Sequence, residues 1–312
     1  MTSLIDELDR DRDLTAETGE EANAGSWLEV RCEFPLGGRP ETPLIPWARL
    51  AAGFEFWRRA DYYSLAFFVR KPPGLRLRFQ IKHSPDEFRR IVTAWVEELE
   101  EVSAVKKHVF SVYEPEEYRF GGPDGMEVAH RVWSLDTELV LSYELLKPGE
   151  RTSLRRTAFW AMLEHHVLKS ALNDDAEIWD VWCRLADACS GLPIDEPTKE
   201  TYRRIAPALI DPHTNLLGLF TPQLRSIWAN AQKANVESAN AIRRLRDGGK
   251  LNRGLRSWLT ANALFRLNRW AVGLEVGELR ALTEAMVELL EPDRSCLRRY
   301  PEREQPSRTT GT

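Results

Sequence analysis

The stretch Leu75–Tyr113 reads LRLRFQIKHSPDEFRRIVTAWVEELEEVSAVKKHVFSVY and predicts a strand, a helix and a second strand in succession. In Leu75–Ile81 apolar and polar residues alternate, which is typical of a β-strand with two different faces. Residues 84–87, SPDE, supply a helix cap, a first-turn proline and a capping-box glutamate, and apolar residues follow at helical spacing. Lys107–Tyr113 then favours a strand again. We therefore predict a βαβ crossover, whose helix carries the chain to a strand beside or near the first.

The sequence on either side of this unit predicts a sheet before it and helices after it. Trp27–Phe34 and Tyr62–Val69 have the composition of strands, and a Pro-Pro-Gly turn joins the latter to Leu75–Ile81 as a hairpin. Helical patterns occupy residues 46–59, 126–133, 136–146, 155–172, 176–189, 198–209, 221–248, 258–270 and 278–290, with Asp136 expected as a cap. The predicted fold class is α+β, with an N-terminal sheet and a βαβ crossover packed against a largely helical C-terminal half.

Composition and charge favour a globular protein with a large core. The chain has 312 residues, 43% of them hydrophobic and 29% charged. Residues 1–25 hold eight acids and two bases, so this segment carries −6 of the net charge of −5 and the remainder carries +1. A nearly neutral body excludes a domain-wide basic field for nucleic acid. We expect disordered tails at 1–25 and 292–312 and a single domain at 26–291, since no linker-like stretch interrupts it.

Motifs for cofactors and metals are missing from the sequence. The four cysteines show no CxxC spacing, and no P-loop, GxGxxG or GxSxG occurs. His165 and His166 are adjacent on a predicted helix and point about 100° apart, so they cannot chelate one metal together. We expect no metal and no cofactor. The scattered cysteines, the acidic N-terminus and the lack of a run of about 18 apolar residues favour a cytoplasmic protein with reduced thiols and no membrane span.

Three arginines indicate a binding site. Arg76 and Arg78 lie two residues apart on a predicted strand, so they share one face and can bind a carboxylate or a phosphate. The alternative is an ordinary solvated sheet face. Arg119 lies in YEPEEYRFGG, residues 113–122, where the glycine pair lets backbone or ligand approach closely. The alternative for Arg119 is an ion pair within its own loop. We predict that the three arginines form one anion site.

Five segments occur in an order that resembles one protein family. They are FFVR (67–70), LRLRF (75–79), YEPEEYRFGGPDGMEVAH (113–130), the pair Asp136-Thr137 and LNR (267–269). Together they resemble the C-terminal, glutamate-elimination domain of class I lanthipeptide dehydratases. The same module occurs as a stand-alone thiopeptide-type bacteriocin biosynthesis protein. The resemblance covers residues 27–290.

The resemblance implies a lyase in the maturation of a ribosomally made peptide of the lanthipeptide or thiopeptide type. A partner enzyme uses glutamyl-tRNA to glutamylate Ser or Thr side chains, and this module then expels glutamate to leave dehydroalanine or dehydrobutyrine. The implied partners are the precursor peptide and a glutamylating dehydratase subunit, with a cyclase as a further candidate and no direct binding of nucleic acid. Glutamate is a dianionic leaving group when its carboxylates are ionised, and a guanidinium cluster can hold it.

The resemblance also implies which residues form the site. The implied catalytic residues are Arg76, Arg78 and Arg119, and the implied substrate-binding residues are Arg70, Glu116, Gly121, Gly122, Asn268 and Arg269. We expect Arg78→Ala to abolish elimination at little cost in stability, because an arginine on a solvated face contributes little to folding.

Two positions depart from the family pattern. The family usually has a histidine before the RxR strand, where this chain has Gly74, and another four residues before the late Asn-Arg pair, where this chain has Leu264. The late histidine is the expected acid–base group. Without it, another residue such as His165 or His166 handles the proton, the reaction differs, or this copy is catalytically weak. Two other functions therefore stay open: a pyridine synthase that joins two dehydroalanines in a formal 4+2 cycloaddition, and a non-catalytic, leader-binding accessory subunit.

Overall fold

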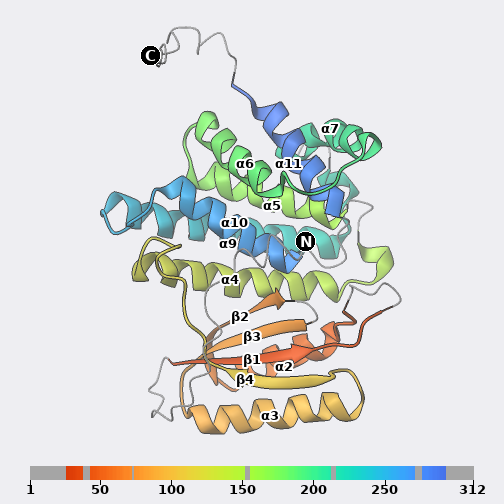
Figure 1. Ribbon diagram of the computed structural model, residues 1–312, viewed down its shortest axis with the longest axis vertical. Helices are drawn as coiled ribbons and strands as arrows, with labels where there is room; N and C mark the ends of the chain where they lie inside the picture. The colour runs from red at the N-terminus through yellow and green to blue at the C-terminus, as the bar shows by residue number, and fades with distance from the viewer. Residues whose placement is uncertain are drawn as a thin grey trace, which may run out of the picture.

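A four-stranded antiparallel sheet forms the N-terminal half of the computed structural model, which describes residues 26–37, 43–71, 74–151, 155–211, 216–270 and 276–292. Its strands are β1 (Trp27–Glu33), β2 (Tyr63–Lys71), β3 (Gly74–Ile81) and β4 (Lys107–Ser111), in the order β2-β3-β1-β4 (Figure 1). β2 and β3 form the predicted hairpin. Helix α3 (Pro85–Glu101) connects β3 to β4, and β1 lies between these two strands, antiparallel to both. The βαβ crossover is therefore confirmed, with β1 inserted in its middle.

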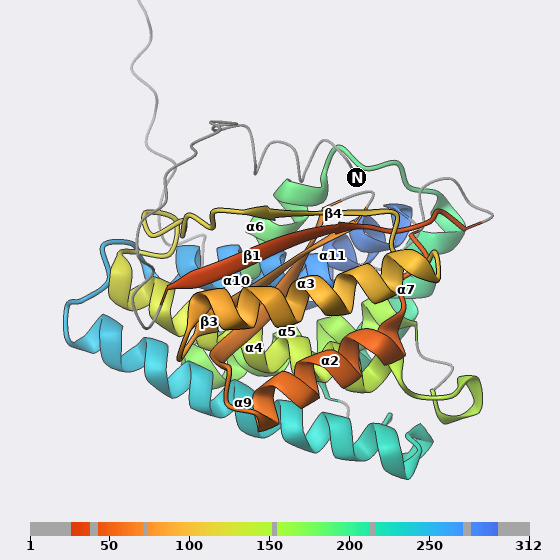
Figure 2. The ribbon, with the colours of Figure 1, turned by 90° about the horizontal axis from the view of Figure 1, so that it is seen from below.

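Two helices, α2 (Trp47–Arg59) and α3, cover one face of the sheet (Figure 2). The ring of Phe79 on β3 packs against Trp57 of α2 and Phe88 of α3, with ring centroids 5.5 and 5.3 Å apart. Because side chains alternate along a strand, this apolar contact directs Arg76 and Arg78 to the opposite face. The strict alternation of β3 therefore decides where the charged residues lie.

The C-terminal half consists of helices stacked beyond the β2 side of the sheet (Figure 1). They are α4 (Pro123–Glu144), α5 (Arg156–Ala171), α6 (Asp175–Cys189), α7 (Glu196–Ile210), α9 (Pro222–Asp247), α10 (Leu255–Trp270) and α11 (Val276–Leu290), with short 3-10 turns at Pro148–Glu150 and Leu217–Leu219. Together with the N-terminal sheet they confirm the α+β fold class.

The prediction of two helices at 126–133 and 136–146 is wrong, because both belong to the continuous helix α4. Asp136 does not cap a helix. It lies within α4, nearly buried, and its carboxylate binds Arg266 and Arg269 of α10. These tertiary ion pairs outweigh the local preference of aspartate for a helix start.

Helix α4 runs beside the outer edge of β2 and satisfies its backbone. The Ala66 amide donates to Ser134 Oγ at 3.2 Å, and the Phe68 amide donates to Thr137 Oγ1 at 3.4 Å. Further along the strand, Asn268 of α10 accepts from the backbone N–H of residue 70 at 2.7 Å and donates to the same residue's carbonyl at 2.9 Å. Side chains of the helical half thus take the place of a fifth strand and protect the edge of the sheet.

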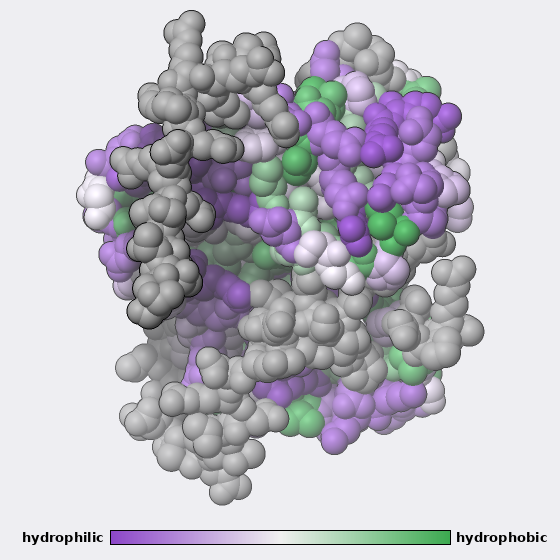
Figure 3. All heavy atoms as spheres, turned by 45° about the horizontal axis from the view of Figure 1, so that its top comes forward, coloured by the Kyte–Doolittle hydropathy of each residue, from purple (hydrophilic) through white to green (hydrophobic). Residues whose placement is uncertain are grey.

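One continuous core of buried side chains joins the sheet to the helices. Hydrophilic residues cover most of the described part of the surface in Figure 3, with small groups of apolar residues between them. No helix in the described ranges is both long and apolar enough to cross a membrane. Cys32, Cys183 and Cys189 are free thiols. Residues 1–25 and 293–312 lie outside the described residues. They include Cys296 and almost all of the two expected tails, so the domain limits 26–291 stay a prediction.

Candidate functional site

Four charged residues lie side by side on the sheet face opposite α2 and α3, and we call them the arginine face: Glu29 and Arg31 of β1, and Arg76 and Arg78 of β3. The strand register pairs Glu29 with Arg78 and Arg31 with Arg76. Glu29 is 1% exposed and accepts hydrogen bonds from Arg78 Nε at 2.6 Å and Arg31 Nε at 2.9 Å. A carboxylate of the protein itself therefore binds Arg78, one of the three arginines predicted to receive an anion, together with Arg31, which was not predicted.

The electrostatics of this face keep Glu29 ionised. Burial opposes its ionisation, but the charge and hydrogen bond of Arg78, the hydrogen bond of Arg31 and the charge of Arg76 together lower the pKa of the carboxyl. The sequence pattern did not reveal this residue. Alternation in WLEVRCE places Glu29 and Arg31 on one face, but the contact with Arg78 depends on β1 pairing with β3.

The environment of Arg78 corrects one expectation. Its side chain is not on a solvated face, because the residue is only 9% exposed and binds a fully buried glutamate. Replacing Arg78 with alanine removes a charged partner from Glu29, which costs more stability than an exposed arginine does. The premise of a solvated face is therefore wrong, and we now expect the substitution to cost about 2 kcal/mol of stability.

Arg78 also packs on an aromatic cluster that contains an unexpected histidine. Its Cζ lies 4.1 Å from the ring centroid of Tyr113 and 5.5 Å from that of Phe67. The Tyr113 hydroxyl lies 2.7 Å from His130 Nε2, and both residues are nearly buried. The Trp27 ring packs on both, at 5.2 and 4.5 Å. His130 was not predicted to have a role, although the segment 113–130 that carries the resemblance begins at Tyr113 and ends at His130.

Both members of this pair are neutral at physiological pH. Burial, with a smaller contribution from Arg78, lowers the pKa of His130 to about 4. Burial likewise raises the pKa of Tyr113 above its ordinary value. The site thus holds a neutral imidazole hydrogen-bonded to a neutral phenol, directly beside a guanidinium.

Arg119 approaches the same aromatic cluster from the loop before α4. Its Nη1 donates to Glu116 Oε2 at 2.7 Å, so the ion pair considered as an alternative is present. Its Cζ also lies 5.9 Å from the ring of Phe265, which stacks on Trp133 at 4.6 Å with the two planes 6° apart. Trp133 in turn contacts Phe67 at 5.1 Å. Contiguous aromatic rings therefore link the surroundings of Arg78 and Arg119.

The glycine pair beside Arg119 serves the backbone. Gly121 and Gly122 have φ values of 76° and 105°, which side-chain-bearing residues rarely adopt. The Gly121 carbonyl accepts from the amide of Asn252 at 2.8 Å, and a Cβ on Gly122 would lie 3.0 Å from the Asn252 side chain. The close approach predicted here is therefore made by the chain before α10, which fixes the loop that carries Arg119.

The remaining predicted binding residues lie deeper. Both groups of the Asn268 amide are used by the backbone of Arg70, as described for the β2 edge. The Arg70 side chain is nearly buried, and burial, followed by the nearby charge of Arg156, lowers its pKa to about 10. Arg269 is fully buried: its Nε donates to Asp136 at 2.7 Å, while Nη1 and Nη2 have no hydrogen-bond partner within the described ranges. These residues belong to the interior between sheet and helices.

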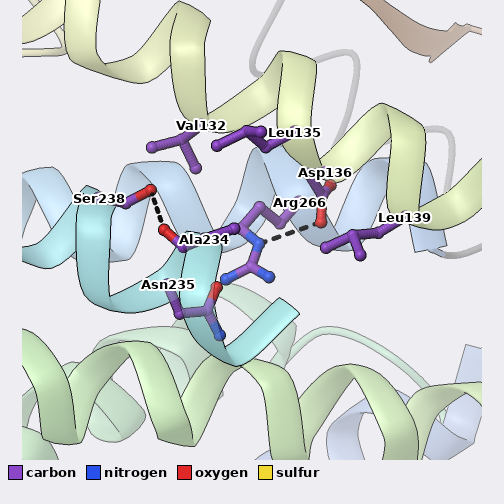
Figure 4. Close-up of a pocket in the computed structure, with 8 residues that line it drawn as sticks. All are labelled: Val132, Leu135, Asp136, Leu139, Ala234, Asn235, Ser238 and Arg266. Atoms are coloured by element: carbon purple, nitrogen blue, oxygen red, sulfur yellow. Dashed lines mark hydrogen bonds and ion pairs between the residues drawn. The ribbon is translucent and has the colours of Figure 1, made fainter. Parts of the chain in front are cut away.

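Arg269 is part of a second group of charges, which we call the buried ion cluster: Asp136, Glu164, Arg266 and Arg269. Arg266 binds Asp136 through Nε and Glu164 through Nη1, each at 3.2 Å. Figure 4 shows Arg266 from α10 beside Asp136 of α4, with Asn235 and Ser238 of α9 lining the same small pocket. Burial raises the pKa of Glu164 to about 7, although the charge of Arg266 opposes the shift.

The positions that depart from the family pattern cannot carry a proton. A Cβ on Gly74 would lie 1.7 Å from the Cys32 carbonyl oxygen, so no side chain fits there without a shift of the backbone. Leu264 is half-buried against the core. His165 and His166 lie on α5, which packs against α9. Nδ1 of His166 lies 3.5 Å from Nδ2 of Asn235 on α9. No group of three or more His, Cys, Asp or Glu residues in the described part of the chain is arranged to hold a metal ion.

Solved structures share this fold. The crystal structure of the tRNA dependent lantibiotic dehydratase MibB from Microbispora sp. 107891 superposes with a TM-score of 0.59 at 16% identity over 92% of this chain, which spans only 29% of the length of MibB. The crystal structure of TsrL superposes with a TM-score of 0.55 at 15% identity, over 88% of this chain and 99% of TsrL. No curated protein sequence matches the chain.

The family match covers most of the site. The family described as "Lantibiotic biosynthesis dehydratase C-term" matches residues 50–279. This range includes Arg76, Arg78, Arg119 and the Tyr113–His130 pair, whereas Glu29 and Arg31 on β1 precede it. Because the match spans well over half of the 312 residues, the chain belongs to the lantibiotic biosynthesis dehydratase C-terminal family.

Proposed function

We propose that this protein eliminates glutamate from glutamylated Ser or Thr side chains of a ribosomally made precursor peptide, as the elimination subunit of a split dehydratase. The observation that carries the proposal is the concentration of arginines on the arginine face, where Arg31, Arg76 and Arg78 lie around one ionised carboxylate, Glu29. Arg119, which pairs with Glu116, adjoins the same aromatic cluster. Glutamate departs as one carboxylate and carries a second, and guanidinium groups bind carboxylates.

The arginines suit the chemistry of the leaving step. In the elimination, a base removes the α-proton of the modified residue, and the C–H electron pair forms the Cα=Cβ double bond. The Cβ–O bond breaks, and its electron pair leaves with glutamate as a carboxylate. Negative charge develops on that oxygen, and a fixed guanidinium stabilises it more strongly in a partly buried site than in water.

The two structural neighbours support the proposal of a split arrangement. The chain spans a minor part of MibB but nearly all of TsrL, so its fold exists both within a long protein and as a chain of its own size. In this proposal, a separate enzyme attaches glutamate to the peptide. The proposed partners are therefore the precursor peptide and a glutamylating dehydratase subunit.

The direct test uses a synthetic peptide that carries a glutamyl ester on serine or threonine. On addition of the purified protein, mass spectrometry should show the loss of glutamic acid and the formation of the dehydroamino acid. Arg119→Ala should abolish this loss, because it removes a site charge at the expense of only one partly exposed ion pair. Arg203→Ala is the matched control, since Arg203 forms an exposed pair with Glu288 away from the site. An unchanged peptide mass with the unaltered protein would refute the proposal.

Pyridine formation is the second candidate, and the pairing of Arg78 with Glu29 favours it. An arginine already bound to an internal carboxylate is less available to a glutamate leaving group. The test is a peptide that already contains two dehydroalanines, from which a pyridine synthase releases a leader fragment. If neither substrate reacts, the remaining candidate is an accessory subunit. Such a subunit should co-purify with a dehydratase, and the activity of that complex should survive Arg76→Ala and Arg119→Ala in this chain.

A further inference from the structure

We infer that Tyr113 and His130 form the proton relay of this site, with the Tyr113 hydroxyl as the catalytic group and His130 as the positioning residue that takes up the proton behind it. The inference rests on the proposed elimination and names the groups that perform its proton transfer. Gly74 and Leu264 have no titratable side chain, so neither can transfer a proton. The Tyr113–His130 pair supplies the missing proton-transfer group.

The geometry of the pair is that of a pre-formed relay. The Tyr113 hydroxyl and His130 Nε2 are 2.7 Å apart, within the range of a strong hydrogen bond. The imidazole is fixed by ring contacts to Trp27 at 4.5 Å, Phe67 at 5.7 Å and Trp133 at 5.6 Å. A ring held on several sides retains the orientation in which Nε2 meets the phenol.

The relay lies where the proposed substrate is bound. The Arg78 guanidinium packs at 4.1 Å against the ring whose hydroxyl binds His130. A carboxylate held by Arg78 therefore lies close to the phenol. Among the described histidines, His130 is the one whose ring contacts Tyr113 and Phe67, the two rings beneath Arg78. By contrast, His108 binds Glu100 of α3, and His83 binds Asp61.

The proton transfer balances without any further reactant. The Tyr113 oxygen accepts the α-proton of the modified residue while the hydroxyl proton moves to His130 Nε2, which becomes an imidazolium. The C–H electron pair forms the double bond, and glutamate leaves with the electrons of the Cβ–O bond. The imidazolium then returns its proton through Tyr113 to the departing carboxylate or to water, which restores the neutral pair.

Bound substrate adjusts the basicity of the pair. The charged groups that face it are Arg78 of β3, Glu29 of β1 and Glu116 in the loop after β4. After burial, Arg78 is the group that holds the pKa of His130 down. The free carboxylate of the glutamyl ester offsets the charge of Arg78 and raises that pKa above about 4. The acid limb of kcat should therefore lie at higher pH than the acid limb of kcat/KM, because only kcat reports the complex.

The experiment compares Tyr113→Phe and His130→Phe, which keep an aromatic ring and remove the transferring atom, with the control His108→Phe. We expect kcat for glutamate elimination to fall at least about 100-fold in both test variants, with KM changed little, and to stay near the original value in the control. His130→Phe should also lose the acid limb. If His130→Phe does not fold, His130→Gln serves in its place.

Two outcomes separate the inference from the proposed function. Elimination at an undiminished rate by folded Tyr113→Phe and His130→Phe proteins, with an unaltered pH profile, would overturn the relay alone. Failure of the unaltered protein to eliminate glutamate would overturn the proposed function, and the relay with it.

Discussion

The arginine face and the buried ion cluster are built from the same residue types but are suited to different tasks. In the buried ion cluster, Asp136, Glu164, Arg266 and Arg269 are all at most 2% exposed, and two arginines meet two carboxylates. On the arginine face, the Arg31 side chain is 41% exposed and arginines outnumber carboxylates. The side chains of the buried ion cluster are almost completely shielded from solvent, whereas the arginine face holds more arginines than carboxylates and is partly open to solvent.

The two carboxylates at the centres of these groups respond oppositely to their surroundings. Glu29 is held ionised, because several arginines outweigh its burial. Glu164 retains its proton up to about pH 7, because burial outweighs the charge of Arg266. Glu29 has three arginines nearby, whereas Glu164 is more deeply buried, binds one arginine and lies near the charge of Asp136, so the number of arginines and the depth together decide the charge state. The same difference distinguishes a region that stabilises the fold from a region that can receive an anion.

The largest effect is expected from Asp136→Ala, which would leave the buried Arg269 without its carboxylate and Arg266 with Glu164 alone. The free energy of unfolding should fall by about 3–5 kcal/mol, as for other buried ion pairs that lose one partner. Urea denaturation measures this loss. The matched control is Asp180→Ala, which breaks partly exposed pairs with Arg184 and Arg256 and should cost less than about 1 kcal/mol. Equal losses in the two variants would contradict a structural role for the buried ion cluster.

A pH-dependent effect of up to about 3 kcal/mol is expected from Glu164→Gln. In the folded protein the carboxyl keeps its proton up to about pH 7, whereas in the unfolded chain it loses the proton near its ordinary value of 4.5. The folded state then binds more protons, so stability falls as pH rises between these values, by roughly 1.4 kcal/mol per pKa unit. The glutamine variant should lack this slope when urea denaturation is repeated across the range. An unchanged slope would show that Glu164 ionises in the fold.

Glu29→Gln should act in the opposite sense and more weakly. Its lowered pKa stabilises the fold at neutral pH, and this contribution is lost as pH falls through the folded-state value. Losing the charge should cost about 1–2 kcal/mol at pH 7. It should also free Arg78, so calorimetry should show L-glutamate binding several-fold more tightly. Glu33→Gln, an exposed position on the same strand, is the control. Weaker binding of glutamate to the Glu29 variant would contradict an anion-binding arginine face.

Local patterns in the sequence predicted most of the fold because they act over few residues. The cap at Ser84 forms as expected, with its Oγ accepting from the Glu87 amide at 3.3 Å, and the alternation of β3 correctly separates arginines from apolar residues. The division of α4 at Asp136 failed because the carboxylate's partners, Arg266 and Arg269, are about 130 residues away in the chain. Propensity describes a residue's neighbours in sequence, and burial brings others into contact.

The site was predictable to the same extent. The two-residue alternation of side chains along a strand predicted that Arg76 and Arg78 share one face of the sheet, and they do so in the structure. The carboxylate between the arginines could not be identified, because Glu29 reaches Arg78 only through strand pairing. Likewise, Tyr113 and His130 are 17 residues apart and meet only because α4 turns back beside the sheet. Residues that share a local pattern were found, and residues joined by topology were not.

The smallest effect is expected from Leu264→His, which restores the histidine usual in the family. Leu264 is half-buried on α10, one residue from Phe265 of the aromatic cluster, so a histidine there can be accommodated at a cost of about 1 kcal/mol or less. If Tyr113 and His130 already transfer the proton, glutamate elimination should change less than about 2-fold, within the error of most kinetic assays. The informative comparison is the same substitution placed in His130→Phe. A new histidine that restores activity there, yet adds none to the unaltered protein, would mean that the two positions are interchangeable carriers of one proton. A large gain in the unaltered protein would instead mean that this copy lost its base, and that the arginine face remains as a binding surface whose chemistry has weakened.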